Sequence, residues 1–127
     1  MSKPDILVID DEPEICLNIK AMFEYVDYEA DYATTAKEAF QKMAERAYDL
    51  ILVDIKLEGR VSGIEIIKSF REKARRPKII VITAIPPEAL NPTFEREGIT
   101  SLIDGFIDKP SCGDPEKLVG LARRALR

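Results

Sequence analysis

Three apolar runs constrain the fold of this chain more than any other feature of the sequence. Each is rich in β-branched side chains and stops abruptly at a polar residue. The runs and the residues that stop them are Ile6–Ile9 with Asp10, Leu50–Val53 with Asp54, and Ile79–Ile82 with Thr83. Continuous apolar runs of this length are typical of strands buried on both faces of a sheet. Apolar residues at helical spacing follow the runs, which favours a mostly parallel sheet covered by helices on both faces.

Two weaker strands complete the pattern. Tyr28–Ala33 carries too many charges for a central strand and belongs at an edge, and Gly105–Asp108 is a short strand that ends at Lys109. With right-handed crossovers, these strands predict a doubly wound α/β fold of five parallel strands in the order 2-1-3-4-5. We expect residues 1–127 to form a single domain, since this length corresponds to about one.

Helix boundaries are marked by capping signals. A helix is expected from about Pro13, and Thr35 with Glu38 forms a capping box that opens a helix with Ala39, Phe40 and Met43 on one face. A third helix carries Ile64, Ile67 and Phe70, and a last one opens at Asp114–Pro115.

The segment Ala84–Ser101 departs from this regular alternation. It contains Pro86, Pro87 and Pro92, and a proline inside a helix costs on the order of 3 kcal/mol. We therefore expect a loop followed at most by a short helix near Pro92–Glu97, which makes the fourth helix region irregular.

Composition excludes several kinds of protein. The chain has no histidine, which removes Ser-His-Asp and Cys-His triads and HExxH zinc sites. Its net charge of -4 argues against a nucleic-acid surface, so we expect no direct nucleic-acid binding. Cys16 falls in a predicted helix and Cys112 in a predicted loop; the two fit no metal spacing, and we expect two unpaired thiols. The sequence shows no signal-peptide core and no membrane span, so we expect a cytoplasmic protein without membrane contact.

The polar residues that stop the strands predict a functional site. In a parallel sheet, Asp10, Asp11, Asp54, Thr83 and Lys109 would lie along one edge, and ligands of such sheets bind where the strand order reverses. Clustered carboxylates repel, and a hard cation such as Mg²⁺ (or Mn²⁺) relieves this repulsion. Carboxylates, a cation, a lysine and a hydroxyl together suit phosphoryl transfer, in which a carboxylate can itself be the nucleophile.

The motifs VIDDEP, LILVDI, VITA and GFIDKP occur in order at the ends of the predicted strands. The chain resembles, over about Ile6 to Leu126, the receiver domain of two-component response regulators, which has a flavodoxin-like (βα)5 fold. The resemblance implies that Asp54 is the phosphoacceptor. It also implies that Asp10, Asp11, Asp54 and the backbone carbonyl of Lys56 hold Mg²⁺ or Mn²⁺.

The same resemblance assigns the switch residues and the partners. Thr83 matches the hydroxyl that moves to bond the phosphoryl group, Lys109 the lysine that pairs with it, and Phe106 the aromatic that turns inward on activation. A sensor histidine kinase or a histidine phosphotransfer protein would donate the phosphoryl group. The phosphorylated domain would then act on a downstream protein target, with a phosphorylation-dependent dimer as one possibility. Such a domain catalyses its own phosphorylation and dephosphorylation and is not otherwise an enzyme.

Three departures from the family pattern concern the loop after Asp54 and the fourth helix. Glu58 stands where the family has a proline, and Gly63 lies about one residue later than usual. The separation of 26 positions from Thr83 to Lys109 exceeds the family norm.

Two other functions compete with the phosphorylation switch. A pseudo-receiver would keep the fold as a phosphorylation-independent protein-binding module, but the complete set of acidic, hydroxyl and lysine residues argues against it. A small Mg²⁺-dependent phosphatase with an aspartyl nucleophile typically has a second aspartate two residues later, where this chain has Lys56.

Overall fold

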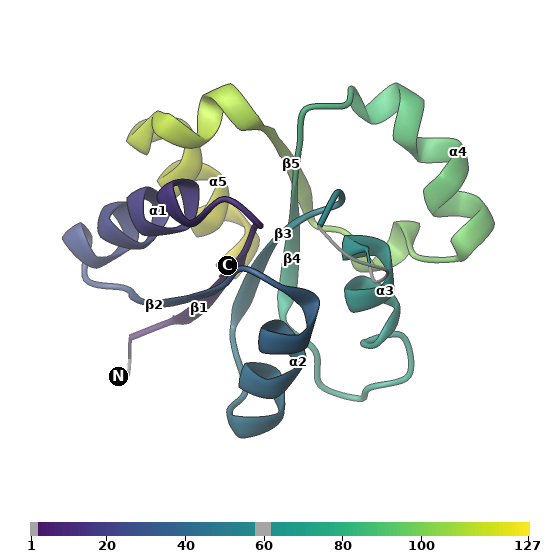
Figure 1. Ribbon diagram of the computed structural model, residues 1–127, viewed down its shortest axis with the longest axis horizontal. Helices are drawn as coiled ribbons and strands as arrows, with labels where there is room; N and C mark the ends of the chain where they lie inside the picture. Colours follow the sequence, from purple (N-terminus) through teal and green to yellow (C-terminus); the bar gives the residue numbers. More distant parts are fainter. Residues whose placement is uncertain (1–2, 58–61) are drawn as a thin grey trace.

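The computed structural model describes residues 3–57 and 62–127, and Glu58 lies outside the described residues. Five parallel strands form one sheet in the order β2-β1-β3-β4-β5, as predicted (Figure 1). The strands are β1 (Asp5–Ile9), β2 (Glu29–Ala33), β3 (Leu50–Asp54), β4 (Lys78–Thr83) and β5 (Gly105–Asp108). The charged strand β2 lies at one edge, and only its last residue is buried.

Helices cover both faces of this sheet (Figure 1). They are α1 (Pro13–Tyr25), α2 (Ala36–Glu45), α3 (Gly63–Lys68), α4 (Pro87–Glu97) and α5 (Pro115–Leu126), with two 3₁₀ helices, η1 (Thr100–Leu102) and η2 (Lys109–Gly113). The first and last helices pack on one face with Ile6, Val8 and Leu52, and the middle three pack on the other with Leu7 and Ile51. Successive strand residues thus bury their side chains on opposite faces, each burial stabilising the fold by about 1.5–3 kcal/mol.

The predicted helix starts are confirmed with one small change. The Thr35 hydroxyl accepts the Glu38 N–H at 3.1 Å, and the Asp114 carboxylate accepts the Glu116 N–H at 3.0 Å. Glu38 reaches back one residue further than a standard capping box, since its carboxylate accepts the N–H of Thr34 at 3.0 Å.

The prediction for Ala84–Ser101 was wrong. Helix α4 begins at Pro87, not near Pro92, and Pro92 lies inside its 11 residues. Pro87 fits because the first helical N–H has no partner within the helix. The interior proline is tolerated because Leu90 and Phe94, four residues apart, are buried and outweigh the lost hydrogen bond.

The sequence also explains where α4 ends. Gly98 adopts φ 71°, in the left-handed region that glycine enters without steric cost. The Ile99 N–H then bonds to the Phe94 carbonyl at 3.0 Å, and Ile99 is fully buried. The 26 positions from Thr83 to Lys109 therefore contain a complete helix, the 3₁₀ helix η1 and strand β5.

Two smaller predictions need correction. Phe40 does not join the buried face of α2, since 37% of it is exposed while Ala39 is buried. Cys112 was expected in a loop and lies in η2. Both cysteines are buried and unpaired, as predicted. Within residues 3–57 and 62–127, no helix has the length and apolar character that crossing a membrane requires.

We predict that Pro92→Ala raises the free energy of unfolding by about 1–3 kcal/mol. Pro92 is exposed, so the substitution restores a helical N–H without losing buried surface. Urea denaturation measures the change, and Glu95→Ala, an exposed site on the same helix, should stay within about 0.5 kcal/mol of the parent. A Pro92→Ala protein no more stable than the parent would contradict this view of α4.

Candidate functional site

The residues predicted for the site meet at the carboxyl edge of the sheet. Asp10 follows β1, Asp54 and Thr83 end β3 and β4, and Lys109 follows β5. A cleft of about 460 Å³ lies at this edge, lined among others by Asp11, Asp54, Lys56, Thr83 and Lys109. Asp10 is fully buried beside the cleft.

Lys109 is the centre of the charge network. Its Nζ lies 2.8 Å from Asp54 Oδ2, 2.9 Å from Glu12 Oε2 and 3.5 Å from Asp10 Oδ2. Burial alone would lower the pKa of Lys109, but hydrogen bonds to Asp54 and Glu12 outweigh it and hold the pKa above its ordinary value. The lysine therefore remains a cation and links three strand ends.

Asp54 is buried and held at both carboxylate oxygens. Oδ2 faces Lys109, and Oδ1 accepts the Lys56 N–H at 2.9 Å. Gly63 packs so closely below this turn that any added Cβ would overlap the Asp54 carbonyl oxygen, so the position needs glycine. The backbone at Asp54 and Ile55 is thereby fixed against the start of α3.

Asp10 is a buried carboxylate with incomplete compensation. Its Oδ1 accepts the Glu12 N–H at 2.9 Å, whereas its Oδ2 has no hydrogen-bond partner among the described residues. Burial, and to a lesser degree the nearby charge of Asp54, raises the pKa of Asp10 to about 6. Desolvation is therefore a larger cause of the raised pKa of Asp10 than repulsion among the clustered carboxylates.

Thr83 and Phe106 lie on neighbouring strands next to a second, smaller hollow. The Thr83 hydroxyl accepts the Ile85 N–H at 2.9 Å. The hollow, of about 240 Å³, is lined by Thr83 and Phe106 among others. The half-buried Phe106 ring stacks on Phe94 of α4, with ring centroids 5.9 Å apart.

Sequence reasoning missed Glu12. It is exposed and pairs with Lys109 across 97 sequence positions, which no local pattern reveals. Its place directly after the two aspartates was the available signal. The cysteines add no nucleophile, because burial raises the pKa of Cys16 and of Cys112 to about 12.

The acidic groups fit a hard divalent cation. One carboxylate oxygen from each of Asp10, Asp11 and Glu12 lies within 4.8 Å of the others. Oxygen donors of this kind suit Mg²⁺, which would also coordinate the Asp10 oxygen that has no hydrogen-bond partner among the described residues. With an anchored carboxylate and a lysine across the cleft, the arrangement is chemically suited to accept and neutralise a phosphoryl group.

Comparison with known proteins identifies the relatives of this chain. The family model of the response regulator receiver domain matches residues 6–123. The transcriptional regulatory protein ResD of Bacillus subtilis is 36% identical over 122 residues, which cover 96% of this chain and 48% of ResD. The response regulator ArlR of Staphylococcus epidermidis is 30% identical over 124 residues, covering 97% of this chain and 52% of ArlR. The chain thus spans about half the length of these relatives.

A solved structure gives the same architecture. The CheY-like response regulator receiver domain protein of Methanospirillum hungatei superimposes with a TM-score of 0.82 at 27% identity. The superposition covers 98% of this chain and 94% of that protein.

We predict that Asp10→Asn stabilises the metal-free protein at neutral pH. A carboxyl whose pKa is raised by folding favours the folded state below its unfolded pKa of 3.8, and this contribution is lost as the pH rises past about 6. This rise in the pKa of Asp10 from 3.8 to about 6 corresponds to at most about 3 kcal/mol of the free energy of unfolding. Urea denaturation in EDTA should show the gain at pH 7.5 and a much smaller one at pH 4.

Asp11→Asn, which removes a half-buried carboxylate, serves as the control and should have the smaller effect at pH 7.5. Equal stabilisation by the two variants, or stabilisation that does not depend on pH, would show that the buried Asp10 charge does not destabilise the folded protein.

Proposed function

The chain belongs to the response regulator receiver domain family, whose members are phosphorylation-dependent signalling switches, and from this premise we propose that Asp54 accepts the phosphoryl group. The observation that carries the proposal is the anchoring of Asp54 by Lys109 at 2.8 Å and by the Lys56 N–H at 2.9 Å. A carboxylate held at both oxygens at the mouth of a cleft is oriented before the donor arrives.

The transfer step is a simple displacement. A carboxylate oxygen of Asp54 forms a bond to phosphorus while the bond from phosphorus to a histidine nitrogen of the donor breaks. That nitrogen keeps the electron pair and takes up a proton. Lys109, which stays cationic, then pairs with the new phosphoryl oxygens in place of the free carboxylate. In this sense the domain catalyses its own phosphorylation. Attack of water on the same phosphorus breaks its bond to the Asp54 oxygen, restores the carboxylate and releases inorganic phosphate.

Receiver domains bind Mg²⁺ at an acidic pocket, and the acidic cluster of this chain fits that role. We propose that Asp10, Asp11, Asp54 and the backbone carbonyl of Lys56 hold Mg²⁺ or Mn²⁺. The ion would supply positive charge that offsets the phosphoryl oxyanion. Because Asp11 lines the cleft and Asp10 is buried beside it, Asp11 is the more accessible ligand.

Thr83 and Phe106 form the proposed switch. A phosphoryl group on Asp54 offers the Thr83 hydroxyl a charged acceptor, stronger than the neutral Ile85 carbonyl to which it donates now at 3.3 Å. Movement of Thr83 would open space beside Phe106, where a hollow already lies. Further burial of the phenyl ring stabilises the new state by up to about 1.5–3 kcal/mol, enough to shift a population tenfold or more.

Receiver domains interact with histidine kinases and downstream effectors. We propose for this chain a sensor histidine kinase or a histidine phosphotransfer protein as donor, a downstream protein as target and the cytoplasm as location. Residues 1–127 are proposed to act as one receiver domain. A dimer that forms on phosphorylation would be one output of the switch.

We predict that acetyl phosphate adds one phosphoryl group to the protein and only when Mg²⁺ or Mn²⁺ is present. Intact-mass measurement follows the reaction, and Asp54→Asn should abolish it. Asp108→Asn, an exposed aspartate at the same edge of the sheet, should keep full uptake. Undiminished uptake in Asp54→Asn would refute the assignment of the phosphoacceptor.

We predict that phosphorylation changes amide hydrogen exchange between Thr83 and Phe106 and leaves α1 and α2 unaltered. Beryllium fluoride with Mg²⁺ serves as the phosphoryl mimic, and Asp54→Asn, which lacks the acceptor carboxylate, is the matched control. If amide exchange in this segment stayed unchanged while the mimic was bound, the proposed switch would be contradicted and the phosphorylation-independent binding module would be favoured.

A further inference from the structure

A third recess lies at the opposite end of the sheet, where β3 and β4 begin. It has a volume of about 430 Å³ and is lined by the end of α2, the loop before β3 and the loop that leads into β4. We call it the basic recess, because its charged lining residues are Arg46, Lys73, Arg75, Arg76 and Lys78 against one carboxylate, Asp49. The net charge of the whole chain is -4, whereas the charge of the residues that line this recess is positive.

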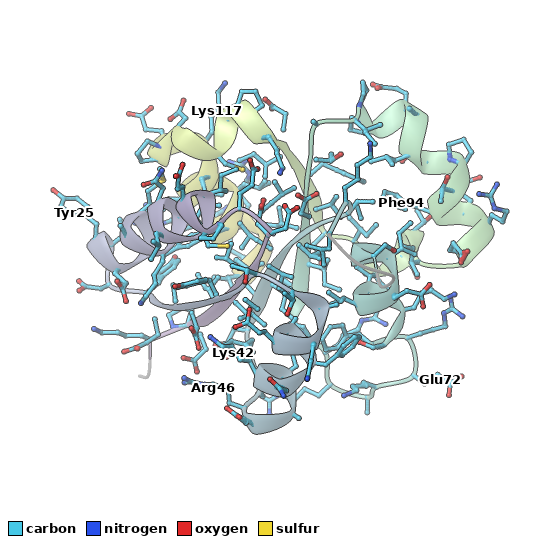
Figure 2. All side chains as sticks on the ribbon, viewed as in Figure 1. Tyr25, Lys42, Arg46, Glu72, Phe94 and Lys117 are labelled. Atoms are coloured by element: carbon cyan, nitrogen blue, oxygen red, sulfur yellow. The ribbon has the colours of Figure 1, made fainter. Side chains whose placement is uncertain are left out.

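The acids near the basic recess pair with only one of its five cations, Arg46. The Asp49 carboxylate accepts the Asp5 N–H at 2.7 Å, and Asp5 pairs with Arg46 at 2.8 Å. Glu72, the acid within the loop before β4, points outward from the protein (Figure 2) and does not line the recess. Within residues 3–57 and 62–127, no carboxylate forms an ion pair with the four remaining cations, which are Lys73, Arg75, Arg76 and Lys78.

Two rings lie against the cations of the recess. Arg46 sits over the ring of Tyr48 at 5.6 Å from its centroid, and Lys73 over the ring of Phe70 at 5.7 Å. Both rings are more than nine-tenths buried, so they support the cationic side chains and offer little surface to a ligand. Recognition in the recess would therefore rest on charge and on the planar donors of arginine.

We propose that the basic recess binds a small ligand that carries a chain of phosphate groups, such as a nucleoside triphosphate or inorganic tripolyphosphate. Four cations without acidic partners match several adjacent negative charges, and arginine binds phosphate oxygens in a bidentate manner. The volume is that of a small-molecule site, and the concave shape favours a compact anion over an extended nucleic-acid or membrane surface.

Isothermal titration calorimetry in EDTA and 150 mM NaCl tests the proposal with sodium tripolyphosphate, ATP and inorganic phosphate as probes. We expect one site for tripolyphosphate, with a dissociation constant at least about tenfold below that of phosphate. Arg75→Gln with Arg76→Gln should weaken binding about tenfold or more. Equal affinities for ATP and tripolyphosphate identify the phosphate chain as the recognised part, and tighter binding of ATP adds a contact to the nucleoside.

The control is Lys37→Gln with Lys117→Gln, which removes the same charge from two exposed lysines outside the recess. It should leave the affinity unchanged. If both double variants lost affinity for tripolyphosphate equally, the loss would come from overall charge and the proposal would be overturned. The absence of saturable binding would overturn it as well. A short DNA duplex or anionic phosphatidylglycerol vesicles could instead bind more tightly than tripolyphosphate. If Arg75→Gln with Arg76→Gln weakened that binding, the ligand of the recess would be DNA or a membrane surface, and the proposal of a small ligand would be overturned.

Backbone amide NMR shifts locate the site independently of affinity. Tripolyphosphate should shift resonances in residues 43–51 and 70–78 and leave Asp54, Thr83 and Lys109 unaffected. Shifts confined to the acidic cleft would overturn the proposal without bearing on phosphorylation of Asp54.

Discussion

One lysine that faces three carboxylates holds the acidic end of this molecule together. Asp10 is completely buried and Asp54 nearly so, and removing such charges from water costs several kcal/mol per ion unless they are paired. Lys109 supplies the pairing, with contacts of 2.8 Å to Asp54 and 3.5 Å to Asp10. Because Lys109 follows β5, Asp10 follows β1 and Asp54 ends β3, the network requires the strand order of the sheet. The compensation stays partial, which leaves the site receptive to a further cation and to a phosphoryl group.

The sheet and most of the site could be predicted because their signals are local. Strands buried on both faces appear as unbroken apolar runs, and in a parallel sheet the residues that stop those runs must share an edge. This is enough to bring Asp10, Asp54, Thr83 and Lys109 together without any knowledge of side-chain contacts. The edge position of β2 follows in the same way from its charges.

The failures arise where distant contacts override a local rule. Pro92 is unfavourable inside a helix by itself, yet burial of Leu90 and Phe94 on the same helix decides the outcome. Phe40 lies at a spacing that suits the buried face of α2, but it remains partly exposed. In the sequence Glu12 looks like an ordinary surface acid, because only the fold brings Lys109 next to it. For Glu12 the deciding partner lies 97 positions away in the sequence, and for Pro92 and Phe40 the outcome depends on how far each helix is buried, which spacing alone does not reveal.

The two ends of α4 are held differently, and this bears on how a change at Asp54 travels. At its C-terminal end Glu97 pairs with Lys68 at 3.1 Å, and the Glu97 carbonyl accepts a hydrogen bond from Arg71, which ties the helix to α3 and the loop after it. At its N-terminal end the chain arrives from Thr83 through two prolines, beside the hollow that Phe106 lines. Free space thus lies next to the carboxyl edge of the sheet, and the contacts that hold α4 lie away from it. A displacement of Thr83 would therefore act on the start of α4 while its end stays anchored, and Phe94, stacked on Phe106 between the two, would carry the tilt to the surface of β5.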